Sequence, residues 1–350
     1  MNLSRFALHQ TPLKIPFLGL GVFEPKGEPN RSLRKRFDYE SDRFGWRVDY
    51  EKLAEEQELK KLMKGLYQHV FEGTSEFDNG EFESLDSIID SETGLPADLF
   101  VDTGGGGDTV VTGDGNDVVY VGGYADSIGA KVVTQGGHDL VFGSNGDDIV
   151  IAGSGNDHVN AGSGNDCINL GDGWDSCSGG SGNDFISGGG GDDFLTGDSG
   201  QDKIFGGLGE DHLDGESVGS LISTDSDLLA GGGDADSFQI YLDGKTDWIL
   251  DFNDIGDKIC LRANPLSGPL GFDDWFLQES AYVAPELAQA LTSYESPIKC
   301  FNIINSETGQ IAASVTKGFE DSLLSGPVHV KLNADSIEIV SQDLATMTLF

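Results

Sequence analysis

An aspartate recurs every nine residues through the middle of this chain. The series is Asp108, Asp117, Asp126, Asp139, Asp148, Asp157, Asp166, Asp175, Asp184, Asp193, Asp202 and Asp211, with two further units at Asp227 and Asp236. Every interval is nine residues except 13 between Asp126 and Asp139 and 16 between Asp211 and Asp227, which indicates insertions of four and seven residues. Such a short, constant period is typical of a solenoid in which identical units stack on one another.

Each aspartate is followed, two residues later, by one apolar side chain that we expect to face the interior. This series is Val110, Val119, Ile128, Val141, Val150, Val159, Ile168, Cys177, Ile186, Leu195, Ile204, Leu213, Leu229 and Phe238. Glycine stands two residues before the aspartate in 11 of 14 units and four residues before it in ten. Glycine permits positive φ and lets carbonyl oxygens point at a cation, and strand residues alternate between two faces. Each unit therefore predicts a turn followed by a short strand.

The repeated unit resembles the RTX nonapeptide family, the hemolysin-type calcium-binding repeats, whose pattern is G-G-x-G-x-D-x-U-x. Residues 179–187 read GGSGNDFIS and residues 206–214 read GGLGEDHLD. The resemblance covers about residues 103–239, with departures at Tyr124 and in the unit 222–230, where Ser223 and Asp225 replace the two glycines. It implies a mainly β fold, a right-handed parallel β-roll in which two nonapeptides make one turn and calcium lies between loops 18 residues apart.

On this resemblance the metal ligands are the twelve aspartates from Asp108 to Asp211. Stacking would pair Asp139, Asp157, Asp175, Asp193 and Asp211 along one edge, and Asp148, Asp166, Asp184 and Asp202 along the other. Carboxylates and carbonyls are the oxygen ligands that Ca²⁺ prefers, so we expect about seven sites in this uninterrupted run. Because one apolar residue in nine makes a thin core, we expect the roll to fold only when calcium binds.

The net charge limits which partners the chain can have. Its 350 residues include 60 acidic and 21 basic side chains, a net charge of -39. Phosphates would repel such a polyanion, so the bulk surface excludes nucleic acid and anionic membranes as partners. No apolar run reaches the ~18 to 20 residues of a transmembrane helix. Residues 1–64 differ from the rest, because they carry 13 of the basic side chains and a net charge of +3.

We expect three parts. Residues 1–101 form a basic N-terminal segment with an acidic connector, residues 102–239 form the roll, and residues 240–350 form a β-rich cap. An amphipathic helix is expected from about residue 51 to 71, because apolar residues recur at helical spacing. These are Leu59, Leu62, Met63, Leu66, Tyr67 and Val70. In the cap, strand-like segments lie at 301–304, 329–332 and 337–340, and a helical stretch lies near 285–291.

Two features indicate export from the cell. The N-terminus does not read as a cleaved secretion signal, and residues 343–350 resemble the uncleaved C-terminal signal of the type I route. We therefore expect a secreted, extracellular protein that uses type I secretion machinery, with association to the cell surface left open. Its function would be structural, surface-related or adhesive. The alternative is a toxin-like effector or hydrolase that uses the repeats as its folding and export module.

No enzyme activity is expected. The histidines form no HExxH pair. One GxSxG string exists at residues 215–219, but it lies in the seven-residue insertion and lacks the buried strand of a nucleophile elbow. Among the four cysteines, Cys177 is expected to face the interior and Cys167 the outside. Cys260 and Cys300 could form a disulfide or remain separate thiols, and the sequence does not decide between the two.

Overall fold

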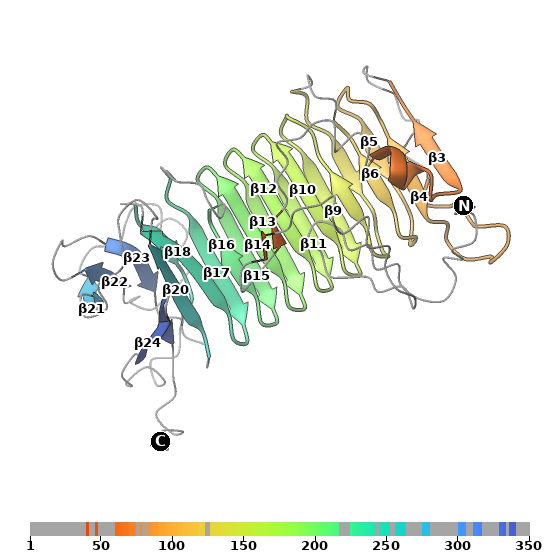
Figure 1. Cartoon of the computed structure of the whole chain (residues 1–350). Helices are drawn as coiled ribbons and strands as arrows, with labels where there is room; N and C mark the ends of the chain where they lie inside the picture. Colours follow the sequence, from red (N-terminus) through yellow and green to blue (C-terminus); the bar gives the residue numbers. More distant parts are fainter. Residues whose placement is uncertain are drawn as a thin grey trace, which may run out of the picture.

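Two parallel β-sheets run the length of the molecule and face each other as a β-solenoid of about eight turns (Figure 1). The computed structural model describes residues 40–41, 46–47, 60–74, 78, 82, 85–122, 127–216, 225–242, 245–252, 256–263, 275–280, 300–305, 311–316, 329–333 and 336–340. The expected parallel β-roll is confirmed.

Consecutive strands along the chain alternate between the two sheets. The parallel strands of the 12-stranded sheet are β3 (His69–Glu72), β4 (Leu99–Asp102), β6 (Val118–Tyr120), β8 (Leu140–Phe142), β10 (His158–Ser163), β12 (Ser176–Ser181), β14 (Phe194–Ser199), β16 (His212–Asp214), β18 (Ser237–Leu242) and β20 (Lys258–Ala263). Those of the 11-stranded sheet are β5 (Thr109–Val111), β7 (Lys131–Val133), β9 (Ile149–Ser154), β11 (Cys167–Asp172), β13 (Phe185–Gly190), β15 (Lys203–Leu208), β17 (Leu228–Gly233) and β19 (Asp247–Ile249).

The register of these strands shows two nonapeptides per turn. Val159 pairs with Cys177, and Cys177 with Leu195, so neighbouring strands are offset by 18 residues. The four-residue insertion widens this offset to 22 at Val119 and Val141. The seven-residue insertion widens it to 25 at Ile204 and Leu229. The inserted residues therefore leave the pairing of the strands intact.

Thirteen of the fourteen residues expected to face inward are buried in the core between the sheets, Cys177 among them, whereas Cys167 is exposed as expected. The exception is Ile128, whose side chain is 58% exposed, so that prediction is wrong. Val132 in β7 is fully buried in its place, paired with Val110 and Val150. The reason is local, because the β-branched residues 132–133 favour a strand over the residues around Gly129. Asp126 lies outside the described residues.

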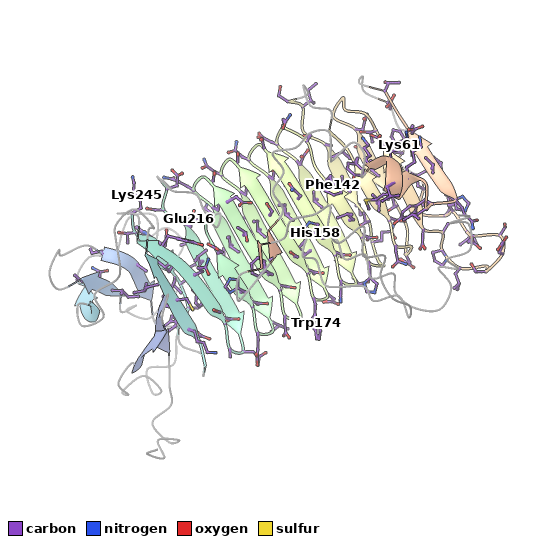
Figure 2. All side chains as sticks on the ribbon, viewed as in Figure 1. Lys61, Phe142, His158, Trp174, Glu216 and Lys245 are labelled. Atoms are coloured by element: carbon purple, nitrogen blue, oxygen red, sulfur yellow. The ribbon has the colours of Figure 1, made fainter. Side chains whose placement is uncertain are left out.

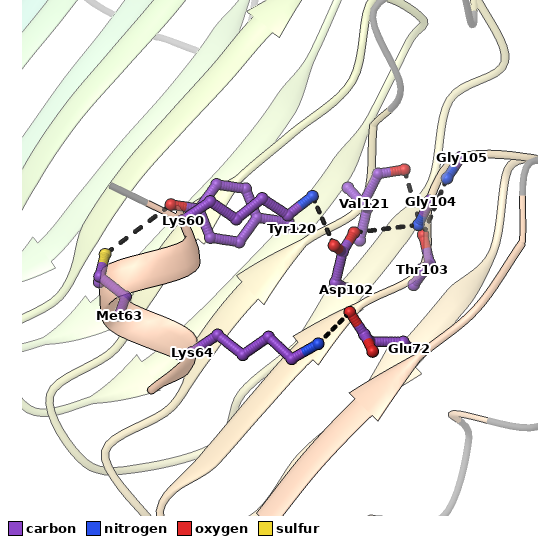
Figure 3. Close-up of polar contacts among 10 residues, drawn as sticks. All are labelled: Lys60, Met63, Lys64, Glu72, Asp102, Thr103, Gly104, Gly105, Tyr120 and Val121. Atoms are coloured by element: carbon purple, nitrogen blue, oxygen red, sulfur yellow. Dashed lines mark hydrogen bonds and ion pairs between the residues drawn. The ribbon is translucent and has the colours of Figure 1, made fainter. Parts of the chain in front are cut away.

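A short helix and two strands continue the roll at its N-terminal end. Residues 60–64 are helical, and β3 and β4 pair in parallel at the edge of the 12-stranded sheet. Helix residue Met63 packs against Phe100 and Tyr120 on the outer face of that sheet. Lys60 forms an ion pair with Asp102 at 2.6 Å and lies over the ring of Tyr120 (Figure 3).

The expected helix over 51–71 is wrong at its C-terminal end. Its last stripe residue, Val70, lies in β3, because the chain here pairs with β4 and extends the sheet. The part of the expected helix before residue 60 lies outside the described residues.

Antiparallel strands replace the parallel ones at the C-terminal end (Figure 1). Strand β20 pairs with β25 (Ser336–Val340), which pairs with β24 (His329–Asn333). Strand β19 pairs in parallel with β23 (Ile311–Thr316), which pairs with β22 (Cys300–Asn305) and then β21 (Trp275–Ser280). The three strand-like segments of the cap are thus confirmed. The expected helix at 285–291 and the export signal at 343–350 lie outside the described residues. Cys260 lies in β20 and Cys300 in β22, in different sheets.

Candidate metal centre

The repeat aspartates form two continuous files, one along each edge of the roll. In both files, Oδ1 of an aspartate accepts a hydrogen bond from the backbone N–H of its equivalent one turn earlier, at 2.7–3.1 Å. The first file is Asp117, Asp139, Asp157, Asp175, Asp193, Asp211, Asp236 and Asp257. The second file is Asp148, Asp166, Asp184, Asp202, Asp227 and Asp247. The pairing of aspartates 18 residues apart is therefore confirmed.

The N-terminal start of each file is less regular. At the start of the first file, the backbone N–H of Leu99 donates to Oδ1 of Asp117. Before the second file, the backbone N–H of Asp78 donates to Oδ1 of Asp108. At the four-residue insertion Ala130 stands where an aspartate is expected, because its N–H donates to Oδ1 of Asp148 at 2.5 Å. The second file therefore has a gap between Asp108 and Asp148.

In eight of these carboxylates the second oxygen is buried and accepts no hydrogen bond from the residues that the structure describes. Within the described part of the chain, Oδ2 accepts no hydrogen bond in Asp157, Asp166, Asp175, Asp184, Asp193, Asp202, Asp211 and Asp227. This oxygen turns back over the first residue of its own unit. A Cβ placed on Gly179 would stand 2.4 Å from Oδ2 of Asp184, and one on Gly188 would stand 2.2 Å from Oδ2 of Asp193. Each turn thus holds an acceptor oxygen in a space that a side chain would fill.

The fourth residue of the unit is glycine for a reason that the sequence does not reveal. A Cβ on Gly182, whose φ is +137°, would stand 1.7 Å from the carbonyl oxygen of Gly164, its equivalent one turn earlier. The turns therefore stack backbone on backbone, with no room for a side chain. Among the described residues, positive φ outside glycine occurs only at Gln135, Asp198 and Asp234, all of which occupy glycine positions of the repeat.

Burial raises the pKa of every file aspartate from Asp117 to Asp236. Loss of solvation is the largest cause, and it raises the pKa of Asp157 to about 7 and that of Asp166 to about 8, although the N–H donated to each carboxylate opposes the shift. The pKa of Asp227 is raised to about 10 by burial and by the neighbouring charges of Asp247, Asp202 and Glu216. Ionised carboxylates in such places are unfavourable unless a cation compensates them.

The donor set fits a hard divalent cation. Buried carboxylate oxygens without partners, next to turns that are almost entirely backbone, are the ligands that Ca²⁺ takes in flexible coordination. The segment 102–239 holds 25 acidic side chains against two lysines, a net charge of -23. The files are thus suited to binding a row of cations.

The comparison with protein families decides the nature of this segment. Five segments of the chain match the family described as RTX calcium-binding nonapeptide repeat (4 copies): residues 101–128, 133–168, 142–177, 152–186 and 187–217. Residues 101–128 and 133–217 are RTX calcium-binding repeats. None of the curated proteins compared with the chain matches it. The matched RTX segments leave out residues 129–132, where Ala130 interrupts the second file.

Both files extend beyond the matched RTX repeats. Asp227, Asp236, Asp247 and Asp257 continue the same hydrogen-bond pattern at spacings of 20 to 25 residues. Of these, Asp247 and Asp257 were missed as members of the files by sequence reasoning. The signal was present, because each is followed two residues later by a buried isoleucine, Ile249 or Ile259.

A second ladder, also missed by sequence reasoning, lies outside the RTX aspartates. It is built by the residue just before each aspartate. Trp174 donates its N–H to Oδ1 of Asn156 at 3.1 Å, and Asn183 donates to Oδ1 of Asn165 at 2.9 Å. Asparagine suits this position because its amide oxygen accepts the N–H of the next turn without adding charge. The ladder adds hydrogen bonds between successive turns beside those of the aspartate files.

No helix among the described residues is long and apolar enough to cross a membrane.

Proposed function

We propose that the chain is a secreted calcium-binding protein whose roll folds when it meets extracellular Ca²⁺. The observation that carries this proposal is the row of buried Oδ2 atoms that accept no hydrogen bond within the described residues. Folding without metal places these charges in two files, each aspartate close to the next. Their mutual repulsion and their lost hydration both oppose folding.

Bound calcium supplies the positive charge that the files lack. The residues that would hold it are the aspartates of both files, with carbonyl oxygens of the adjoining turns. Each Oδ1 is already oriented by the N–H of the preceding turn, so one turn positions the ligand of the next. Because only the folded roll assembles these ligands, binding stabilises the folded state in proportion to the logarithm of the calcium concentration. Extracellular modules bind Ca²⁺ at ~10⁻⁴ to 10⁻³ M, which is suited to folding after export.

The proposed location and role follow from the repeats. RTX repeat proteins are typically secreted, and residues 343–350 are suited to type I export. We assign the protein a structural or adhesive role at or near a cell surface, without enzyme activity. Removing residues 343–350 should abolish export from a type I secreting host while leaving the calcium response of the purified protein unchanged. Export at the full rate without these residues would contradict the type I assignment.

The calcium-dependent fold is tested by far-UV circular dichroism of the whole chain. We expect little β signal in EDTA, a cooperative gain near millimolar CaCl₂, and no gain with MgCl₂. Mg²⁺ is the control because it requires near-ideal octahedral geometry and keeps its water. A spectrum already rich in β structure in EDTA, and unchanged by calcium, would overturn the proposal.

A further inference from the structure

A group of three buried carboxylates closes the second file at the C-terminal end of the roll. It consists of Glu216, Asp227 and Asp247, whose exposed fractions are 3%, 1% and 4%. One carboxylate oxygen from each lies within 4.8 Å of the other two. The residues come from three segments, because Glu216 follows β16, Asp227 precedes β17 and Asp247 begins β19. Figure 2 shows Glu216 at this end of the roll.

The carboxylate of Asp227 is directed into this group with one oxygen unused by the protein. Its Oδ1 accepts the N–H of Asp202 at 2.8 Å. Its Oδ2 is buried and accepts no hydrogen bond from the residues that the structure describes. A Cβ on Gly215 would stand 2.1 Å from this Oδ2, so the oxygen faces the residue that directly precedes Glu216. Asp247 is held in turn, because its Oδ1 accepts the N–H of Asp227 at 3.1 Å.

This donor set differs from that of the nonapeptides. Glu216 stands at the second position of its unit, where Gly162 and Gly180 stand in earlier turns of the same file. Asp198, one turn before Glu216, also replaces glycine, but its carboxylate accepts a hydrogen bond from the hydroxyl of Ser178. The residues matched as RTX repeats end at 217 and include neither Asp227 nor Asp247. Glu216 therefore adds a carboxylate that the repeat pattern does not provide.

We propose that Glu216, Asp227 and Asp247 together bind one Ca²⁺. A calcium ion takes oxygens at about 2.4 Å, so two of its ligands lie at most ~4.8 Å apart, and the observed spread fits one ion. Three carboxylates also oppose their own burial, and a dication offsets most of their charge. The ion joins the start of the seven-residue insertion to the last two turns of the second file. The inference rests on the proposed function in that Asp227 and Asp247 belong to the second file, and it goes beyond it by adding Glu216 as a ligand.

The test counts calcium ions on the whole chain after equilibrium dialysis. Glu216→Gln keeps the size of the side chain and removes one charged ligand. Glu210→Gln is the matched control, because Glu210 is an exposed glutamate one unit earlier. We expect Glu216→Gln and Asp247→Asn each to lose one ion, the double variant to lose no more than Asp247→Asn alone, and Glu210→Gln to lose none. If the repeats bind no calcium, the wild-type chain still binds one ion, and Glu216→Gln abolishes it.

A second measurement separates metal binding from a merely structural role of Glu216. The melting temperature is followed against calcium concentration for the wild-type chain and Glu216→Gln. Loss of a metal site gives a difference that grows with calcium, because binding stabilises by mass action. The proposal is overturned if Glu216→Gln keeps the full ion count, or if its melting temperature is lowered equally at every calcium concentration. Equal occupancy by Mg²⁺ would overturn the assignment to calcium.

Discussion

At the residue scale, each aspartate inside a file serves two turns at once. Asp175 accepts the N–H of Asp157 through Oδ1 and donates its own N–H to Asp193. Its side chain therefore contacts the turn before, and its backbone contacts the aspartate of the turn after. An aspartate at the end of a file has only one such neighbour.

Asp175→Ala should therefore remove about two calcium ions rather than one. The same change should raise the calcium concentration needed to fold the roll, because fewer ions contribute. Equilibrium dialysis gives the ion count and circular dichroism the midpoint. Asp172→Ala is the matched control, because Asp172 is an exposed aspartate in the same turn. An unchanged ion count in Asp175→Ala would contradict the shared role.

The stacked glycines lead to a second prediction at this scale. Gly182→Ala should destabilise the folded roll on the order of 3 kcal/mol or more, because its Cβ would stand 1.7 Å from a backbone oxygen. Gly94 also has a positive φ, +70°, but nothing lies within 4 Å of its Cβ. Gly94→Ala should therefore cost only about 1 kcal/mol, from backbone strain alone. The calcium midpoint of folding measures both. Equal shifts would show that conformation, not stacking, requires glycine at position 182.

Most of the candidate site follows from the sequence, because the constant period aligns equivalent residues automatically. Asp139 and Asp157 lie in register through spacing alone, and no three-dimensional information is needed. The spacing does not show how many further turns of the roll follow after the nine-residue period has ended. Asp247 and Asp257 follow irregular intervals, so spacing alone does not place them in the files, and the pairing of β17 with β19 and of β18 with β20 does. The sequence likewise does not indicate that Glu216 is a ligand, because the seven-residue insertion separates it from Asp227 along the chain.

At the element scale, the four-residue insertion shows where periodic reasoning fails. Counting nine residues from Val119 reaches Ile128, but β7 begins three residues later and puts Val132 inside. The extra residues precede the strand, and a period fitted to the aspartate cannot show on which side of the strand an insertion lies. The inward position expected for Ile128 is therefore occupied by Val132, and Ile128 is exposed.

Two substitutions distinguish these registers. Val132→Asp should prevent folding even in calcium, because it buries an uncompensated charge between the sheets. Ile128→Asp should leave the calcium midpoint nearly unchanged, because that side chain is 58% exposed. Circular dichroism in saturating calcium reports both variants. If Ile128→Asp unfolds the roll and Val132→Asp is tolerated, the register given for β7 is wrong.

The fold itself is predictable because its two-strand turn is repeated. The structure of the N-terminal end is not predictable in the same way, because one run of apolar residues continues from the helix into β3 and its spacing fits either a helix or a strand. Val70 matches a helical stripe in the sequence, yet Phe100 beside it in the sheet decides for a strand. Local pattern is a weak guide wherever a neighbouring strand offers an edge.

At the scale of the whole molecule, protons and calcium stabilise the same files in different ways. Burial raises the pKa of Asp175 to about 6 and those of Asp166 and Asp193 to about 8 in the metal-free fold. An aspartate in the unfolded chain titrates near ~3.9. Between these values the folded roll binds more protons than the unfolded chain. The stability that these groups contribute is therefore fully present below about pH 4 and is lost as the pH rises through about 6 to 8.

In EDTA, the chain should accordingly show more β signal at about pH 5 than at about pH 7.5, because the protonated files no longer repel one another. In calcium the dependence reverses, since protons compete with Ca²⁺ for the same oxygens. The calcium concentration at the folding midpoint should thus rise as the pH falls from about 7.5 to 5. Circular dichroism in both series measures this, with sedimentation as a control for self-association near the pI of about 4.1. Equal or weaker β signal at the lower pH in EDTA would show that repulsion among the buried carboxylates does not keep the metal-free roll unfolded.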